Sequence, residues 1–409
     1  MPHALAHAVE IATTALTVAG IGYFLAVLVA ARIFLGRGAQ RPEFAPGVSI
    51  LKSLKGMDPG MLDAFRSHCR QNYTGEFELL FGVSSRDDPA AAAVETLQAE
   101  FPDRAIRLIL CPERLGTNGK VSTLVQLALH ARHEFLLIND SDITVGEHYL
   151  ERVMRCFAPD AQSASAAVSS EDYAARLNSH PDAKRVGLVT ALYRGRAHGS
   201  LPSRLEALGI AAEFMGSVLL SRWVERGLHY GLGSTLAVWR EALEKMGGLL
   251  PLVDHLADDY ELGARVARAG YRVELTREVV ETSVPAYTWR GFIDHQLRWA
   301  RTVRCSRPAG YAGLLVTHGL SWALLNIVAS GLSPLSLWLL ALSFFLRLAQ
   351  AMFVGAGVLA DHETISHLWL LPLRDLIAMA VWIAGFAGNV IVWRGERYAL
   401  ADGKLVKLG

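Results

Sequence analysis

The chain has 409 residues, of which 52% are hydrophobic, and its mean hydropathy is positive. This composition is too apolar for an ordinary soluble enzyme. The net charge of +1 also excludes the strongly basic surface of a typical nucleic-acid-binding protein. Because the apolar excess lies in the terminal regions, we expect membrane-spanning ends around one soluble domain.

The first apolar run, residues 11–31, is uncharged and has about the length that crosses a bilayer. No Lys or Arg precedes this run, and Arg32, Arg37 and Arg41 follow it. That charge order is the reverse of a cleavable signal peptide. By the positive-inside rule, the amino terminus faces outward and the central domain faces the cytoplasm.

Three more apolar runs, residues 314–330, 335–360 and 376–393, are candidate spans near the carboxyl end. Three spans would place the carboxyl terminus outside. The tail is basic, however, and the positive-inside rule associates basic segments with the cytoplasm. The number of spans and the side of the carboxyl terminus therefore stay open.

Strands and helices alternate in the central region. Apolar, β-rich runs predict strands at residues 48–51, 77–83, 106–110 and 135–138. Helical spacing predicts helices at residues 61–69, 90–101 and 121–131. This order is typical of an α/β domain with a parallel sheet and crossover helices.

Two later segments have a different character. Residues 159–179 are rich in Ala, Ser and Asp and predict a surface loop. The apolar segment 205–223 fits a core helix or a helix lying on the membrane equally well.

Two carboxylates follow the predicted strand at residues 135–138. Asp140 and Asp142 are separated by one serine. In parallel sheets, ligands bind outside the carboxyl ends of the strands, and two such carboxylates can share one hard cation. A simple turn is the alternative, because Asp, Asn and Ser all favour turns. Asp87 and Asp88 follow the strand at residues 77–83 in the same way.

Five motifs carry a resemblance to a known family. In chain order they are "VSILKSLKGMDPG", "FGVSSRDDPA", "NDSDITV", "ADDYELG" and "HQLRW". Together they resemble the ceramide glucosyltransferases, a membrane branch of the glycosyltransferase-A superfamily, and the hopanoid-associated lipid glycosyltransferases of bacteria look like the same branch. The likeness extends from the first span to "WRGERYAL" in the tail.

The resemblance implies a glycosyltransferase-A type α/β fold. This is a Rossmann-like mixed sheet with crossover helices, with transmembrane helices at both ends. It also implies three ranges: an anchor at 1–36, a cytoplasmic catalytic domain at 46–310, and carboxyl-terminal transmembrane helices with a tail at 311–409.

The donor implied by the resemblance is a UDP-sugar. Asp140 and Asp142 would hold a divalent metal, Mn or Mg, through the pyrophosphate oxygens, and Asp140 would also face the nucleotide-sugar. Asp88 matches the family's aspartate on the nucleotide side, although a helix cap is its alternative role, which Asp87 could also provide. Lys120, in "GTNGKVS", would lie near uracil or phosphate, with a solvated surface lysine as the alternative.

Asp259, in "ADDYELG", matches the family's general base, and Asp258, which would face the nucleotide-sugar, sits where relatives often carry another acid. A base is needed because an attacking hydroxyl must lose its proton. The alternative is a pair of charges that complement a helix amino terminus. Gly233 and Ser234, in "GLGSTLAVWREAL", would line the sugar pocket in a turn followed by a helix.

The motif "HQLRW" resembles the family's Q/R-x-x-R-W signature, with Arg298 and Trp299 in register. Arg298 would grip the diphosphate, and Trp299 would stack against the sugar or the acceptor. His295, which would also face the nucleotide-sugar, stands where the family usually has Gln or Arg. An amphipathic helix near the membrane, to which Arg301 and Arg304 would belong, is the alternative.

We therefore predict a multi-pass enzyme of the bacterial inner membrane whose catalytic domain faces the cytoplasm. It would transfer a hexose, glucose or N-acetylglucosamine, from a UDP-sugar to a lipid hydroxyl with inversion. Ceramide is the first acceptor considered, and a hopanoid of the bacteriohopanetetrol type is the alternative, because "LYRGRAHG" and "RWARTVR" look more like the bacterial branch. A processive polysaccharide synthase and a non-enzymatic membrane protein are further alternatives. The four scattered cysteines predict reduced thiols.

Overall fold

A computed structural model describes residues 2–36, 41–158, 185–393 and 396–408. The chain divides into two compact units. The helical unit comprises Met1–Arg37, Arg194–Val224 and Val284–Gly409, and the sheet unit comprises Gly38–Tyr193 and Glu225–Ser283. The loop predicted at residues 159–179 lies outside the described residues.

The two units alternate along the chain. Residues 201–224 and 284–310, expected within the catalytic range 46–310, belong to the helical unit together with the terminal apolar helices. How the activity is divided among the three contiguous ranges stays a prediction.

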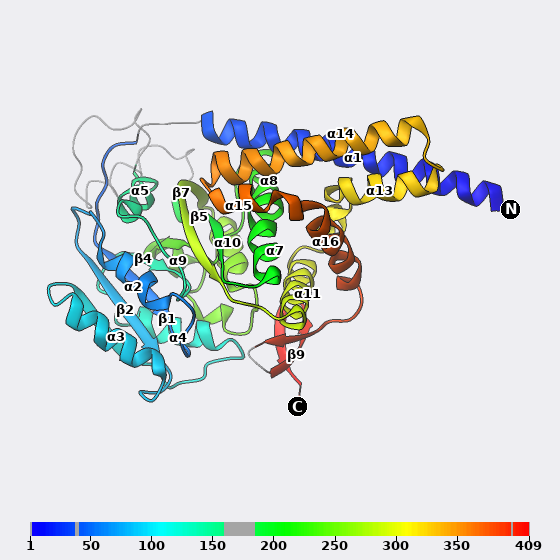
Figure 1. Ribbon diagram of the computed structural model, residues 1–409. Coiled ribbons are helices and arrows are strands. Elements are labelled where there is room, and N and C mark those ends of the chain that lie inside the picture. The colour runs from blue at the N-terminus through cyan, green and yellow to red at the C-terminus, as the bar shows by residue number, and fades with distance from the viewer. Residues whose placement is uncertain (1, 37–40, 159–184, 394–395, 409) are drawn as a thin grey trace. The chain divides into compact units, whose positions relative to one another are not determined.

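The sheet unit is built on a mixed sheet. In its described part, seven strands run in the order β3-β2-β1-β4-β6-β5-β7 (Figure 1). Their bounds are β1 Val48–Ser53, β2 Phe77–Val83, β3 Ala105–Leu110, β4 Phe135–Ile138, β5 Val186–Ala197, β6 Leu236–Trp239 and β7 Arg272–Val284. The first four are parallel neighbours, and β6 pairs antiparallel with both β4 and β5. The predicted fold class is confirmed.

Crossover helices connect the parallel strands. They are α2 Met61–Cys69, α3 Pro89–Glu100 and α4 Gly119–Ala128, with α5 Tyr149–Arg155, α9 Arg240–Lys245, η2 Leu250–Leu252 and α10 Asp258–Arg268 elsewhere in the unit. The strands and helices predicted before residue 140 are all present. Helix α4 begins two residues earlier than predicted, because the Asn118 side chain caps it by accepting from the Val121 N–H at 3.2 Å.

One element was predicted wrongly. The motif at residues 231–243 was expected to be a turn followed directly by a helix, but strand β6 lies between the turn and α9. All four residues of β6 are buried, and the strand is paired on both sides. A run this short and apolar forms a strand when the sheet offers it two neighbours.

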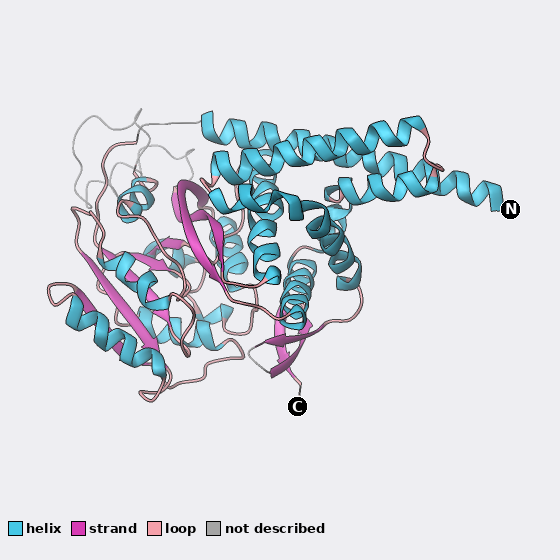
Figure 2. Cartoon of the chain, in the orientation of Figure 1, coloured by secondary structure: helices cyan, strands magenta, loops and turns pink. Residues whose placement is uncertain are grey.

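The helical unit consists mainly of helices (Figure 2). Its elements are α1 Pro2–Gly36, α7 Leu201–Gly209, the π-helix η1 Ile210–Phe214, α8 Met215–Val224, α11 Trp289–Ser306, α12 Pro308–Gly313, η3 Leu314–Thr317, α13 Gly319–Ala329, α14 Pro334–Met352, the π-helix η4 Phe353–Val358, α15 His362–His367, η5 Leu368–Leu370 and α16 Leu371–Gly385. A small sheet follows, with strands β8 Val390–Trp393, β9 Glu396–Ala401 and β10 Lys404–Lys407 in antiparallel order.

Four helical stretches in the described residues are long and apolar enough to cross a membrane. They are Ala4–Gly36, Leu201–Val224, Pro334–Val358 and His362–Gly385. The pair Pro308–Thr317 and Gly319–Ala329 would add a fifth, but it is bent by 58°. The segment at 205–223, left open between a core helix and a membrane-surface helix, is thus part of a candidate span.

The last predicted span, residues 376–393, is wrong at its carboxyl end. The helix ends at Gly385, and residues 390–393 form strand β8. Arg301 and Arg304 of α11 donate to carbonyl oxygens just after this helix, including those of Ala387 and Phe386 at 2.9 and 2.7 Å. These two arginines therefore hold the chain leaving α16, because the last carbonyls of a helix have no partner within the helix.

Candidate active site

The candidate site lies where the strand order reverses. The chain passes from β1 outward to β2 and β3, and then returns to the other side of β1 as β4. In doubly wound sheets, ligands bind outside the carboxyl ends of the strands at such a point. Asp140 and Asp142 follow β4 directly, at the same edge as the end of β1.

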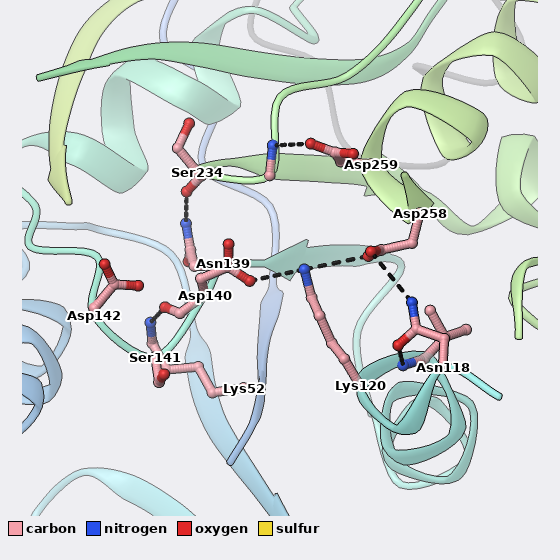
Figure 3. A network of polar contacts seen from close by, with 12 residues as sticks. Lys52, Asn118, Lys120, Asn139, Asp140, Ser141, Asp142, Ser234, Asp258 and Asp259 are labelled. Carbon is pink, nitrogen blue, oxygen red and sulfur yellow. Dashed lines mark hydrogen bonds and ion pairs between the residues drawn. The ribbon is translucent and has the colours of Figure 1, made fainter. Parts of the chain in front are cut away.

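Lys120 joins two of the predicted acids. Its Nζ lies 2.7 Å from Asp140 Oδ1 and 3.2 Å from Asp258 Oδ2 (Figure 3). Burial opposes the charge of Lys120, but the carboxylates of Asp140 and Asp258 outweigh burial and raise its pKa. The interpretation of Lys120 as a solvated surface lysine is therefore wrong. Strand β4 and the first turns of α4 and α10 meet at this cation.

Asp259 lies in the first turn of α10, next to Asp258. Its Oδ2 accepts from the Gly233 N–H and its Oδ1 from the Tyr260 N–H, both at 2.8 Å. Burial and the neighbouring charge of Asp258 raise its pKa to about 6, although Lys120 acts in the opposite direction. A carboxyl group with this pKa can take up a proton near neutral pH, as a general base must.

Gly233 is confined between two carboxylates. A Cβ at this position would lie 3.1 Å from Asp259 Oδ2 and 3.4 Å from Asp140 Oδ2, so a larger residue would push them apart. The next residue, Ser234, is used within the sheet: its Oγ donates to the Ala191 carbonyl at 3.1 Å, and its own carbonyl accepts from Asn139 Nδ2 at 2.7 Å. Contact of Gly233 or Ser234 with a sugar stays a prediction.

Asp142 is held by the end of β7. Its Oδ2 accepts from Thr282 Oγ1 at 2.6 Å and from the Ser283 N–H at 3.1 Å. Burial and the charge of Asp140 raise the pKa of Asp142. The two carboxylates therefore repel each other, and a bound cation would relieve that repulsion.

The side chains at this site supply only part of the ligands that a metal ion needs. In the described ranges, no group of three or more His, Cys, Asp or Glu side chains is arranged to hold a metal ion. The protein thus offers the two carboxylates of Asp140 and Asp142, both hard oxygen donors suited to Mn or Mg. Further ligands would have to come from a bound diphosphate and water, which is the usual situation for a metal that bridges phosphates.

Lys52 is a site residue that the sequence reasoning missed. It lies on β1, its side chain is fully buried, and its Nζ donates to the Asp140 carbonyl at 3.0 Å. Burial lowers its pKa to about 7, although Asp142 and Asp140 act in the opposite direction. A lysine inside a run that otherwise reads as a buried strand was the signal that could have revealed it.

Asp88 is the amino-terminal cap of α3. Its Oδ1 accepts from the Ala90 N–H at 2.9 Å, and the carboxylate also accepts from the Gly56 N–H at 2.9 Å. Gly56 has a φ of +70° in the loop after β1, a conformation that favours glycine. The helix-cap interpretation is thus confirmed for Asp88 rather than Asp87. Contact with a nucleotide stays a prediction.

We expect Asp88→Ala to destabilise the protein by about 1–2 kcal/mol, because it removes a helix cap and the anchor of the Gly56 loop. Asp87→Ala is the matched control, since Asp87 is exposed and its side chain contacts only Ser85 nearby. Thermal unfolding of the two variants measures the difference. Equal unfolding midpoints would contradict the capping role.

His295, Arg298 and Trp299 lie together on α11, in the helical unit. His295 Nδ1 is 2.6 Å from the Tyr287 hydroxyl, and its Nε2 is 3.4 Å from Arg298 Nη2. Burial, followed by the charge of Arg298, lowers the pKa of His295 to about 3, so the imidazole is neutral at pH 7. The Trp299 ring packs 5.0 Å from the His295 ring, centroid to centroid. Their contact with a donor stays a prediction.

A family profile and two known relatives assign the chain to one family. The profile of glycosyl transferase family 21 matches residues 12–165 and 163–406. The chain is 24% identical over 372 residues to ceramide glucosyltransferase 3 of Caenorhabditis elegans, covering 88% of this chain and 73% of the relative. It is 23% identical to ceramide glucosyltransferase 1 of the same organism, with the same coverage.

Among solved structures, the chain is similar to a mannosyltransferase from Pyrobaculum calidifontis in complex with GDP-Man and Mn2+. The TM-score is 0.49 and the sequence identity is 20%, with 92% of this chain and 97% of that chain covered.

Proposed function

The chain belongs to glycosyl transferase family 21, and we propose that it transfers a hexose from a UDP-sugar to the hydroxyl group of a ceramide-type lipid. The ceramide glucosyltransferases to which it is similar support this acceptor class. Glucose is the first sugar proposed, with N-acetylglucosamine second. The observation that carries the proposal is the buried carboxylate of Asp259, held beside the Lys120–Asp140 ion pair at the carboxyl end of β4.

Asp259 is the proposed general base. Its carboxylate accepts the proton of the acceptor hydroxyl while the hydroxyl oxygen forms a bond to the anomeric carbon. The bond from that carbon to the UDP oxygen breaks, and UDP leaves with the bonding electron pair. Because this is a single displacement, an α-linked donor yields a β-glycoside.

The donor diphosphate is the proposed ligand of the residues around Asp140. Lys120 lies in the first turn of α4, and Arg298 is a further proposed cation for the diphosphate. Asp140 and Asp142 would hold Mn or Mg, and the metal would neutralise charge on the leaving diphosphate. Asp88 would fix the Gly56 loop on the nucleotide side, while Asp258 keeps Lys120 in place.

The membrane setting belongs to the same proposal. The apolar helices and the family support membrane association. We place the protein in a bacterial inner membrane as a multi-pass enzyme whose sheet unit faces the cytoplasm, since Arg32, Arg37 and Arg41 follow the first span. The lipid acceptor would then be met at the cytoplasmic leaflet.

Lys120→Met is expected to weaken donor binding by about tenfold, because it removes a cation proposed to face the diphosphate. It should also move the acidic limb of the pH–rate profile to higher pH, since Lys120 lowers the pKa of Asp259. Lys404→Met, at an exposed lysine on β10, is the control. Unchanged donor KM and an unchanged profile for Lys120→Met would contradict both roles.

The proposed reaction is tested with the purified full chain in lipid nanodiscs. UDP-glucose, UDP-N-acetylglucosamine and other UDP-sugars are offered with a panel of N-acylsphingosine, a hopanoid polyol and diacylglycerol. Mass spectrometry should show one hexose added to N-acylsphingosine with release of UDP. Transfer only to the hopanoid would replace the acceptor, growing sugar chains would indicate a processive synthase, and no transfer to any lipid would contradict the proposal.

A further inference from the structure

The helical unit contains two buried charged clusters that differ in one respect. Both lie on helices that include candidate membrane spans. In the first cluster, the buried polar groups satisfy one another. In the second, several buried donors and acceptors have no hydrogen-bond partner among the described residues.

The satisfied cluster is centred on Arg347 of α14. Its Nε and Nη2 donate to the two carboxylate oxygens of Asp375 at 2.8 and 2.7 Å. Its Nη1 donates to the Ala212 carbonyl at 2.7 Å, and Gln350 Nε2 donates to the same carbonyl at 2.9 Å. The chain can therefore pair a buried guanidinium completely in this environment, and this cluster is a structural one.

The incomplete cluster is centred on Arg374 of α16, which is only 6% exposed. Its Nη2 donates to Gln296 Oε1 at 3.2 Å. The same nitrogen lies 3.0 Å from Glu213 Oε2, but that oxygen accepts no hydrogen bond from the described residues. Its Nε and Nη1 have no partner in the described chain. Glu206 of α7 is 4% exposed, and its Oε2 is likewise unpartnered, while its Oε1 lies 3.5 Å from His295 Nε2.

Three helices bring this cluster together. Helices α7, α11 and α16 contact one another pairwise, as Figure 1 shows. The same three helices also form a hydrophobic cluster, which includes Leu205 and Leu208 of α7, Phe292 of α11 and Leu371 of α16. A polar group left unpaired in such surroundings costs about 1–3 kcal/mol. The π-helix η1, which begins directly after α7, is a distortion often found at functional sites.

We propose that this cluster binds the polar head of the lipid acceptor, an uncharged group that combines an amide with hydroxyls. Arg374 offers unused donors to a carbonyl oxygen, and Glu206 offers an unused acceptor to an O–H or N–H group. Glu213 lies 3.0 Å from Arg374, and the charge of Arg374 also acts on Glu206, so the carboxylates around this guanidinium leave no excess positive charge with which to attract a phosphate.

The surroundings favour a lipid over a water-soluble ligand. Helix α16 also exposes the apolar side chains of Leu373, Leu376 and Ile383, which suit acyl chains. On α11, Trp299 stands one turn after His295 and packs near Phe214 of η1, with ring centroids 6.0 Å apart. This inference rests on the proposed function and names the residues that would select its acceptor.

Two substitutions test the site, and one provides the control. Glu206→Gln keeps the shape of the side chain but removes its charge. Gly209→Ala displaces Arg374, because a Cβ on Gly209 would lie 2.3 Å from Arg374 Nε. Gly216→Ala is the matched control in the continuing helix, since its Cβ would lie 2.9 Å from Gln350 Nε2 of the satisfied cluster and 3.1 Å from Val27 Cγ1, and not near Arg374.

The measurements use the full chain in phosphatidylcholine nanodiscs with UDP-glucose. The acceptors are N-acylsphingosine and a diacylglycerol with matched chains, which lacks the amide. Glu206→Gln and Gly209→Ala should raise the acceptor KM by about 10- to 100-fold, change the donor KM less than about twofold, and reduce the preference for N-acylsphingosine. Gly216→Ala should keep the acceptor KM and the preference, even if its unfolding midpoint falls.

A photoactivatable N-acylsphingosine provides a readout independent of transfer. In the unmodified protein it should label α7, α11 or α16, and excess unlabelled lipid should compete. Labelling of other parts of the chain would overturn the inference. So would folded Glu206→Gln and Gly209→Ala proteins whose acceptor KM and preference for N-acylsphingosine are unchanged. The cluster would then bind only water. Competed labelling of these helices without sugar transfer would instead contradict the proposed function and leave the site standing.

Discussion

Asp259→Asn is expected to lower the rate of sugar transfer by about two to four orders of magnitude while UDP-sugar binding is retained. The amide cannot take the proton of the acceptor hydroxyl, but its oxygen can still accept from the Gly233 or the Tyr260 N–H. Single-turnover transfer and equilibrium binding of UDP-glucose, measured on the same protein, separate the two effects.

The pH dependence provides a second check on the base. Because the pKa of Asp259 is raised to about 6, kcat/KM of the unmodified enzyme should fall as the pH drops through this value and the carboxylate becomes protonated. This acidic limb should be missing from the residual activity of Asp259→Asn. Asp258→Asn is the matched control at the neighbouring acid. If Asp258→Asn lost transfer and Asp259→Asn did not, the base would be assigned to the wrong residue.

Removal of divalent cations is expected to abolish transfer, and excess Mn or Mg should restore it. Asp142→Ala should raise the metal concentration needed for half-maximal rate by more than about tenfold. The reason is that Asp140 and Asp142 are the two carboxylates offered to a metal at this site, and the loss of one leaves a single protein ligand.

Binding of Mn2+ in the presence of UDP, followed by electron paramagnetic resonance, tests the metal site without relying on activity. Asp63→Ala is the control, because that carboxylate is 78% exposed and pairs with Arg66 on α2. Full transfer in excess chelator would show that Asp140 and Asp142 act without a metal.

The sequence predicted the local structure of the parallel half of the sheet closely. Strands β1, β2 and β4 are short, mainly apolar and bounded by polar turns, and such runs have few alternatives to a buried strand. The same pattern placed Asp140 and Asp142 at the carboxyl end of β4, since a polar pair that directly follows a buried strand must lie at its end. The charge-free run at residues 11–31 likewise predicted the long helix α1.

Other features depend on neighbours that are distant in the chain. Strand β6 was expected to be part of a turn and helix, because four apolar residues do not reveal that β4 and β5 lie on either side. Asp88 was matched to an aspartate on the nucleotide side, with a helix cap as the alternative, and the sequence could not show that it also binds the N–H of Gly56, 32 residues earlier.

By itself, therefore, the sequence determined the order of the first four strands and the helices between them, the apolar character of the ends and the family motifs, because these depend on residue spacing and type. Only the tertiary structure decided that Lys120 bridges Asp140 and Asp258, that Gly233 supports Asp259, and that Lys52 lies buried beneath the site. It also decided that Arg374 and Glu206 keep unpaired polar atoms. Charge, burial and hydrogen bonding are properties of groups that meet in space, and Lys120 lies 20 positions from Asp140 and 138 positions from Asp258 in the chain.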